Sequence, residues 1–388
     1  MERRFLKIII FTGLLITSCQ QIPINESNKK FVGDNIDKQN LEIDLKKQEK
    51  IISYHSDIWS YILTNSSYTS DGLDEQTLMY MNRHLQDLDK FKEFLNDSYY
   101  FIFFVIEELE NAKLPIELAF LPYIESNYDP FSISSSGAVG MWQFMPRTGR
   151  TYDLERSWWN EDRHDPFKST SAAIKYLKYL YERFDQDLYL TLAAYNAGPS
   201  FLDRQIKRNQ RRGLDSDYWS LDLPIQTRNY VPKFIAIKEL IINSDQYDIE
   251  LPFIPYEPVV AKIEIPGQVE ILTLSEYLNI KPELLYKLNA GYTKWASAPS
   301  EKSVFYIPIE QYDYFQTSEN PFSDSNQINW ISHTVETGDS LWSLARKYDT
   351  EVRIIREINF LENDLLSINA TLLIPLSKTE SNLSLIHI

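Results

Sequence analysis

One carboxyl group, that of Glu125, lies at the end of an almost wholly apolar segment, residues 115–125. Proline at position 115 suits the first turn of a helix, and the apolar residues after it predict a helix that ends at Glu125. Burial disfavours a charged carboxylate, so we expect the pKa of Glu125 to lie above its ordinary value. Such a group can donate a proton near neutral pH. The alternative is a solvated surface glutamate, or one bonded to a local backbone amide.

A turn rich in glycine and aromatic residues, 136–146, follows after a short loop. Gly137 and Gly140 permit backbone conformations and close approaches that other residues resist. Flat or adaptable apolar side chains, together with one amide, could line a cleft for a sugar. These side chains are Trp142, Gln143, Phe144 and Met145. The alternative is a turn that opens a short helix, with its aromatic side chains in the core.

A third segment, residues 190–199, contains small and apolar residues and ends in Gly198 and Pro199. Glycine and proline at these places indicate the end of a helix. Tyr195 and Asn196 then lie in its last turn. Taken alone, they would be a packed ring and a capping amide; a pair that binds a sugar is the other interpretation.

Together with residues 226–233, which include Gln226 and Tyr230, these segments resemble the catalytic region of lytic transglycosylases. Those enzymes cut the glycan strands of bacterial cell walls. The helical segments from residue 57 and the C-terminal repeats narrow the resemblance to the membrane-bound lytic murein transglycosylase D family, over residues 57–375. That family usually has glutamate where this chain has Gln226, so a role that depends on a negative charge there is lost.

The resemblance implies cleavage of the β-1,4 bond between N-acetylmuramic acid and N-acetylglucosamine. Glu125 would protonate the glycosidic oxygen, and the substrate's 2-acetamido group would stabilise the positive charge. The carboxylate would then accept the proton of the C6 hydroxyl, which leaves a 1,6-anhydromuramoyl end. Ser134 would orient Glu125 or the acetamido group. Further substrate contacts are implied for Gln143, Phe144, Met145, Tyr195, Asn196, Gln226 and Tyr230.

Two other functions stay open. A goose-type lysozyme would use the same fold and acid but transfer the glycan to water, and a wall-binding protein would lack catalysis. Ordinary retaining or inverting glycosidases need two carboxyl groups around the bond. Asp129, Asp153 and Asp165 are available, but none has the context of a nucleophile, and Asp129 and Asp165 precede prolines, as turn residues do.

The N-terminal residues 1–18 combine basic side chains with a short apolar run, which favours a secretory signal over a membrane span of roughly 20 residues. Cys19, the only cysteine, follows Ile16-Thr17-Ser18 and resembles the lipidated residue of a bacterial lipoprotein. Gln20 fits an outer-membrane lipoprotein. The polar residues 19–40 would be a tether, with the chain anchored in the outer membrane and facing the periplasm.

Residues 41–250 have helical periodicity throughout, so we expect a mainly α catalytic domain with a helical lead-in. The resemblance implies that its fold is lysozyme-like. One helix is predicted over residues 169–184, capped by Ser169, Thr170 or Ser171.

Beyond residue 251 a pattern repeats with a constant offset of 70 residues, which predicts two copies of one small unit. Residues 331–376 resemble a LysM domain, a βααβ module that binds glycans containing N-acetylglucosamine, and residues 259–310 are a degenerate copy whose glycan binding is open. The resemblance implies glycan contacts from Gly338, Asp339, Ser340, Leu341 and Asn359. Residues 311–330 would be a linker and 377–388 a tail.

The composition bounds the partners of the chain. With 55 acidic and 39 basic residues among 388, the net charge is −16, which argues against nucleic acid. Five scattered histidines and the lack of a glycine-rich phosphate loop predict no metal or nucleotide cofactor. The expected partners are peptidoglycan and a membrane reached through the lipid on Cys19; the sequence indicates no protein partner.

Overall fold

A computed structural model describes residues 57–66, 73–157, 159–298, 302–318, 322, 329–359, 361 and 363–376. The chain divides into two compact units, residues 1–51 and 52–388, and every described residue belongs to the second. The predicted signal, Cys19 and the tether 19–40 lie outside the described residues, as does the tail 377–388.

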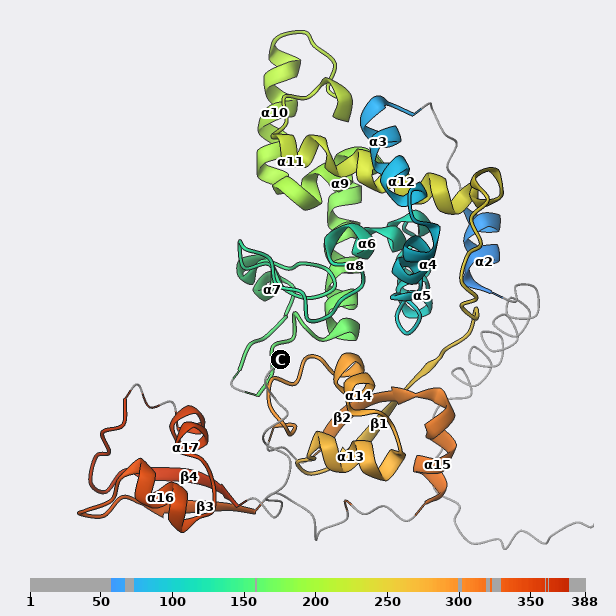
Figure 1. The fold of residues 1–388 in the computed structure, drawn as a ribbon. Coiled ribbons are helices and arrows are strands. Elements are labelled where there is room, and N and C mark those ends of the chain that lie inside the picture. The colour runs from blue at the N-terminus through green and yellow to red at the C-terminus, as the bar shows by residue number, and fades with distance from the viewer. Residues whose placement is uncertain are drawn as a thin grey trace, which may run out of the picture. The chain divides into compact units, whose positions relative to one another are not determined.

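The first part of the described chain is built from helices (Figure 1). They are α2 (Ile58–Asn65), α3 (Glu75–Leu85), α4 (Leu88–Asn96), α5 (Ile102–Ala112), η1 (Ile116–Phe120), α6 (Leu121–Glu125), α7 (Pro146–Thr151), α8 (Pro166–Arg183), α9 (Leu188–Ala197), α10 (Pro199–Arg211), η2 (Tyr218–Ser220), α11 (Ile225–Arg228), α12 (Tyr230–Ile242) and η3 (Ser244–Tyr247). The mainly α fold predicted for this region is confirmed.

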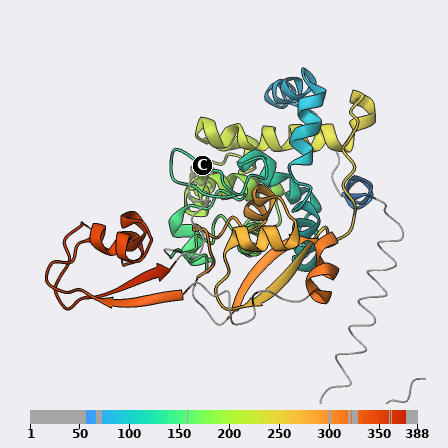
Figure 2. The ribbon, with the colours of Figure 1, turned by 60° about the horizontal axis from the view of Figure 1, so that its bottom comes forward.

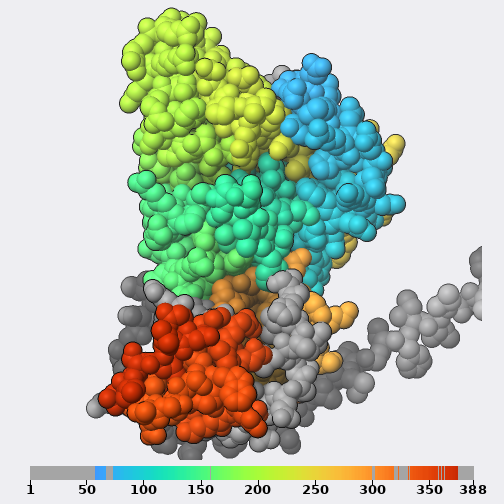
Figure 3. All heavy atoms as spheres, turned by 60° about the vertical axis from the view of Figure 1, so that its left-hand side comes forward, coloured from blue at the N-terminus to red at the C-terminus, as the bar shows by residue number. Residues whose placement is uncertain are grey.

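Helix α12 lies in the middle of this helical part. Eleven of its thirteen residues are buried, and it packs against α3, α6, α9 and η1. Ten of its thirteen residues are apolar and occur around most of the helix, so it must be covered on nearly all sides, which explains this central place. Figure 3 shows atoms of the early helices, in blue, beside yellow atoms of the later ones, as packing of α3 against α12 requires. The packing places the first residue of α12, Tyr230, inside the protein.

Helix α8 begins earlier than predicted. Its first residue is Pro166, and the side chain of Asp165 accepts hydrogen bonds from the amides of Phe167 and Lys168. Capping by Ser169, Thr170 or Ser171 was therefore the wrong prediction, because these residues lie inside the helix. The Asp-Pro pair is itself a strong start signal, since aspartate caps well and proline suits the first helical position.

Two modules of the same architecture follow the helical part (Figures 1 and 2). Module 1 consists of β1 (Val260–Pro266), α13 (Ile271–Leu278), α14 (Pro282–Leu288) and β2 (Lys302–Pro308). Module 2 consists of β3 (Asn329–Thr334), α16 (Leu341–Lys347), α17 (Val352–Ile358) and β4 (Thr371–Leu376). In each module the two strands pair antiparallel. Both copies of the repeat thus have the predicted βααβ order.

An asparagine at the same place in each repeat ties the second helix to the last strand. The side chain of Asn289 donates to the carbonyls of Leu285 and Tyr306 and accepts from the amide of Tyr306, at 2.7–2.8 Å. Asn359 does the same with Ile355 and Leu373. Positions 289 and 359, which are 70 residues apart, therefore make the same hydrogen bonds in the two modules.

Part of the predicted linker is ordered on module 1. Residues 309–317 form η4 (Ile309–Gln311) and α15 (Tyr312–Thr317), and the side chain of Phe322 is buried in the core of the module. The ring of Phe322 meets that of Tyr277 edge to face, at 5.7 Å between centroids. The composition of the predicted linker, which is rich in serine and asparagine, did not indicate that Phe322 packs into module 1.

Replacing Asn289 by alanine removes three hydrogen bonds and leaves the amide and carbonyl of Tyr306 without that partner. We expect a loss of about 1–3 kcal/mol in the free energy of unfolding of module 1. Asn289→Asp places a carboxylate oxygen against the carbonyls of Leu285 and Tyr306, so its loss should be at least as large as that of Asn289→Ala. Scanning calorimetry of the whole chain measures the transition; an unchanged transition in Asn289→Ala would contradict this role.

Candidate active site

Glu125 is the last residue of α6, as predicted, but the segment before it is not one helix. The 3₁₀ turn η1 precedes the single α turn of α6, and both are almost fully buried. The chain then reverses through Asn127 and Tyr128, which have φ values of 59° and 57°. Such values are strained for residues with side chains. A hydrogen bond of 2.6 Å from the Tyr128 hydroxyl to the Ala119 carbonyl holds the reversal in place.

Burial raises the pKa of the half-buried Glu125 carboxyl to about 7, and two groups oppose that rise. The Tyr230 hydroxyl donates a hydrogen bond to Glu125 Oε1, and the positive charge of Lys233 is close enough to favour the carboxylate. Burial also raises the pKa of Tyr230 well above its ordinary value, so its hydroxyl keeps its proton. At neutral pH the acid and the base form of Glu125 are therefore both populated.

The turn of residues 137–144 is fastened to the residues around Glu125 through its backbone carbonyls. Ser126, the neighbour of Glu125, donates from its hydroxyl to the Met141 carbonyl at 2.8 Å. Tyr195, from the last turns of α9, donates to the Trp142 carbonyl, also at 2.8 Å. The glycine-rich turn and two other segments thus meet at one place.

Two aromatic side chains of this turn belong to the core. Trp142 is 0% exposed and donates from its indole nitrogen to the Thr170 hydroxyl, and Phe144 is 2% exposed. Of the two interpretations of these rings, the structure has the one in which they lie in the core, where they bury the turn, Trp142 against α8. Met145 is 43% exposed, and its side chain remains available at the surface.

The polar side chains of the turn hold the turn itself. The amide of Gln143 donates to the Gly140 carbonyl at 2.9 Å and the Ser132 carbonyl at 3.3 Å. Ser134 Oγ accepts from the Ala138 amide at 2.9 Å and lies 3.0 Å from Ser136 Oγ. Within the described residues, neither side chain bonds to Glu125. Orientation of Glu125 by Ser134 has no counterpart in these contacts.

Three of the predicted site residues, Glu125, Tyr195 and Tyr230, do come together. Tyr230 lies 105 positions after Glu125 and bonds to it directly, and the charge of Glu125 helps to raise the pKa of Tyr195, after burial. Asn196 instead accepts a hydrogen bond of 2.9 Å from the Thr227 hydroxyl, which joins α9 to α11. Gln226 lies exposed on α11.

A buried ion pair supports the turn, and the motifs did not reveal it. Arg163 donates to both carboxylate oxygens of Glu161 at 2.8 and 2.9 Å, and its third nitrogen donates to the Phe144 and Gly137 carbonyls at 3.1 and 3.3 Å. Gly140 packs directly against the same residue: a Cβ there would lie 1.9 Å from the Arg163 carbonyl oxygen. The sequence offered no signal for this beyond an acid and a base two residues apart.

In module 2 the residues predicted to bind glycan mostly build the loop before α16. Asp339 Oδ2 accepts from the Glu336 amide and lies 2.8 Å from His333 Nε2, while Ser340 caps α16. The side chain of Leu341 is buried in the module core, which leaves the backbone of this residue for the predicted glycan contact. Gly338 supplies a backbone φ of 99°. Asn359 is bound to β4, as described above.

One large side chain of module 2, that of Trp342, stays at the surface. It is 65% exposed, and the guanidinium of Arg346 lies 5.6 Å from its ring centre. An exposed flat ring with a cation beside it is suited to stacking on a sugar face.

The described residues contain no group of three or more histidine, cysteine or acidic side chains arranged to hold a metal ion. Among them, no helix combines the length and apolarity that a membrane crossing requires.

Comparison with known proteins adds to this geometry. A model of the transglycosylase SLT domain matches residues 104–217, and a model of the LysM domain matches residues 333–375. The chain contains a transglycosylase SLT domain and a LysM domain. The match to the SLT domain includes Glu125, the turn and Tyr195 but ends before Tyr230. The fold therefore supplies a direct partner of Glu125 from beyond the matched residues.

The relatives agree with the resemblance inferred from the motifs. Membrane-bound lytic murein transglycosylase D of Escherichia coli (strain K12) is 28% identical over 350 residues, which cover 86% of this chain and 76% of that protein. A putative tributyltin chloride resistance protein of Alteromonas sp. (strain M-1) is 37% identical over 106 residues, or 27% of this chain and 51% of that one. The predicted combination of a transglycosylase domain with LysM is confirmed.

Replacing Tyr230 by phenylalanine removes the hydrogen bond that favours the carboxylate of Glu125. We expect the pKa of Glu125 to rise above about 7, by roughly one unit. Titration of the Glu125 carboxyl carbon by NMR measures this directly. Tyr348→Phe is the matched control, because that hydroxyl lies in module 2, 2.9 Å from His333 Nδ1. A pKa in Tyr230→Phe that is unchanged or lower would contradict the role of this bond.

Proposed function

We propose that the chain is a peptidoglycan lytic transglycosylase that cleaves the β-1,4 bond between N-acetylmuramic acid and N-acetylglucosamine with formation of a 1,6-anhydromuramoyl end. The observation that carries the proposal is Glu125. Its pKa of about 7 results from burial, the Tyr230 hydrogen bond and the Lys233 charge, and among the described residues no second carboxylate is one of its causes. The reaction needs one group that first gives and then accepts a proton.

In the first step, Glu125 donates its proton to the glycosidic oxygen as the bond to the muramoyl C1 breaks. The substrate's own 2-acetamido carbonyl stabilises the positive charge that develops at C1. Glu125 is now a carboxylate, and the hydrogen bond from Tyr230 and the charge of Lys233 stabilise it. The two side chains thereby reduce the cost of charging a carboxyl in a buried place.

In the second step, the Glu125 carboxylate accepts the proton of the C6 hydroxyl as that oxygen bonds to C1. The anhydro ring closes, and Glu125 returns to its acid form. A pKa near 7 suits both steps, because the ideal acid or base has a pKa close to the working pH. Gln226, which is uncharged and exposed, takes no proton in this scheme.

The remaining predicted site residues transfer no proton in this scheme. Met145 and Asn196 contribute to the glycan cleft, and Tyr195 keeps the turn against Glu125. Ser134, Gln143 and Phe144 act through the shape of the turn. Module 2 holds the peptidoglycan through the exposed Trp342 and the backbone of the loop that contains Gly338 and Asp339.

A retaining or inverting hydrolase would place a second carboxyl about 5 to 10 Å from the first. Asp129 accepts a bond from the Phe131 amide, and Asp165 caps α8, so both are committed to local structure. A protein that only binds the wall would have no use for a buried carboxyl with a raised pKa. The arrangement around Glu125 therefore favours the transglycosylase.

We also propose that the chain is a lipoprotein, attached through Cys19 to the outer membrane and facing the periplasm. The sequence before Cys19 supports this, and the relatives named membrane-bound agree with an envelope protein. An anchor at Cys19 would let the SLT and LysM domains reach the peptidoglycan beside the membrane.

The chain without residues 1–18 should release muropeptides with anhydromuramoyl ends from purified peptidoglycan, each one water lighter than a hydrolysed product. Glu125→Gln should lower the rate about 100-fold or more, because the acid is lost. Mass spectrometry of the soluble products measures both. Reducing ends would establish a lysozyme instead, and binding to the wall without any release would establish a binding protein.

Replacing Cys19 by serine should move the full chain from the membrane fraction to the soluble fraction and abolish labelling with a radioactive fatty acid. Ser18→Ala, which keeps a small residue before the cysteine, is the control and should stay in the membrane. Fractionation of cells that express each variant measures the distribution. A Cys19→Ser chain that remains in the membrane would show that another segment anchors it.

A further inference from the structure

Module 1 is bonded by its backbone to a segment of the helical part. The amide of Thr293 donates to the Trp159 carbonyl and the amide of Glu161 donates to the Gly291 carbonyl, both at 2.9 Å. Between them, Asn160 and Tyr292 pair as an antiparallel bridge. The loop of module 1 between α14 and β2 and the segment 159–161 therefore form a short stretch of β pairing.

Side chains close to this pairing extend the contact. The ring of Tyr306, from β2, stacks on that of Phe167 with 3.7 Å between centroids and 16° between planes. Gly291 packs so tightly against Asp165 that a Cβ at position 291 would lie 2.8 Å from Asp165 Cβ. Phe167 and Asp165 lie at the start of α8, and Asp165 caps it.

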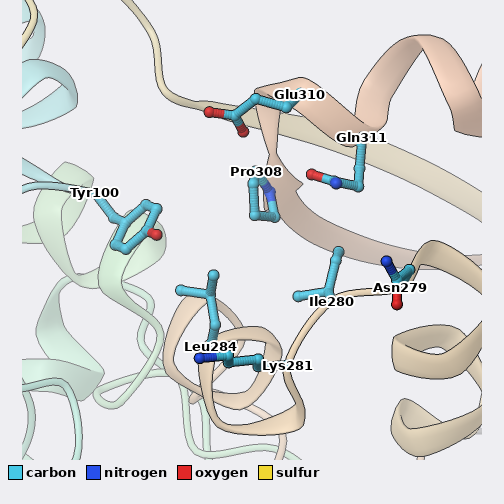
Figure 4. A pocket seen from close by; sticks show the side chains of 8 residues that line it. All are labelled: Tyr100, Asn279, Ile280, Lys281, Leu284, Pro308, Glu310 and Gln311. Carbon is cyan, nitrogen blue, oxygen red and sulfur yellow. The ribbon is translucent and has the colours of Figure 1, made fainter.

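A pocket of about 370 Å³ also lies between the helical part and module 1 (Figure 4). Tyr100 is on one side of it, across from Asn279 and Gln311. The other residues that line it are Ile280, Lys281, Leu284, Pro308 and Glu310. The helical part and module 1 are therefore not in contact everywhere. Their direct contacts include the β pairing and the stack of Tyr306 on Phe167.

The segment that module 1 binds also supports the turn of residues 137–144. Glu161, whose amide bonds to Gly291, holds the guanidinium of Arg163 with both carboxylate oxygens. Arg163 in turn binds the carbonyls of Phe144 and Gly137, and its own carbonyl packs on Gly140. A continuous set of contacts thus runs from Gly291 to the turn.

The turn completes the path to the acid. Its Met141 carbonyl accepts the hydrogen bond of Ser126, which follows Glu125 in the chain, and its Trp142 carbonyl accepts that of Tyr195, whose hydroxyl senses the charge of Glu125. A displacement of the turn would therefore change the surroundings of the carboxyl.

We infer that module 1 is a positioning element of the SLT domain: its loop at Gly291–Thr293 and the ring of Tyr306 hold the segment 159–165, and through Arg163 they keep the turn of residues 137–144 in place beside Glu125. The two modules thus have different roles: module 1 is bonded to the SLT domain through the backbone of this loop, and module 2 is the one proposed to bind the glycan. The inference rests on the proposed function only for its activity readout.

Gly291→Ala is the decisive variant. Its backbone φ is not positive, so alanine is tolerated locally, and the added methyl group acts only by pushing on Asp165. Tyr306→Leu is the second variant, since it removes the ring stack without adding bulk. Glu264→Ala is the control, because it removes an exposed ion pair with Lys302 between β1 and β2.

Hydrogen exchange of the full chain provides a readout that needs no activity. We expect the amides of Val139, Gly140 and Phe144 to exchange about tenfold faster or more in both variants than in the wild type and in the control. On peptidoglycan, kcat should fall about tenfold with little change in KM, because the acid is misplaced while module 2 still binds the wall. Capture by insoluble peptidoglycan should be unchanged.

Unchanged exchange in the turn together with unchanged kcat in both variants would overturn the inference. A fall in wall capture, with the turn unaltered, would also overturn it and make module 1 a glycan-binding module. If Gly291→Ala does not fold, Tyr306→Leu decides alone. If the wild type has no activity, the proposed function fails while the exchange measurement still decides the role of module 1.

Discussion

The opposition between burial and two nearby groups at Glu125 is the constraint on which the site depends. Burial alone would keep the carboxyl neutral and useless as a base, and full exposure to solvent would keep it charged and useless as an acid. One hydrogen bond from Tyr230 and the charge of Lys233 leave the pKa at about 7. Helix α12 supplies both groups, because its packing in the domain places its first turn beside Glu125.

The rest of the domain keeps that balance constant. Backbone carbonyls of the turn accept bonds from Ser126 and Tyr195, and Arg163 binds two more. A buried bidentate pair such as Glu161 with Arg163 contributes little net stability, but it fixes geometry well. Most side chains of the turn are therefore used to hold the turn itself. Trp142 and Phe144 are buried and pack the turn into the hydrophobic core.

The two βααβ modules show how one pattern can have two uses. Both close their second helix onto the last strand with the same asparagine, Asn289 or Asn359. They differ in the residues at the surface: module 2 exposes Trp342, whereas the loop before β2 in module 1 pairs with the SLT domain.

The sequence alone determined the mainly α fold, the position of Glu125 at a helix end, the order of the motifs and the repeat of 70 residues. These follow from local periodicity, from glycine and proline, and from motif order. Only the tertiary structure decided that Tyr230 contacts Glu125, that Trp142 and Phe144 are buried, and that Arg163 supports the turn. Each of these depends on contacts between residues far apart in the chain, where local sequence carries no information about which face a side chain presents.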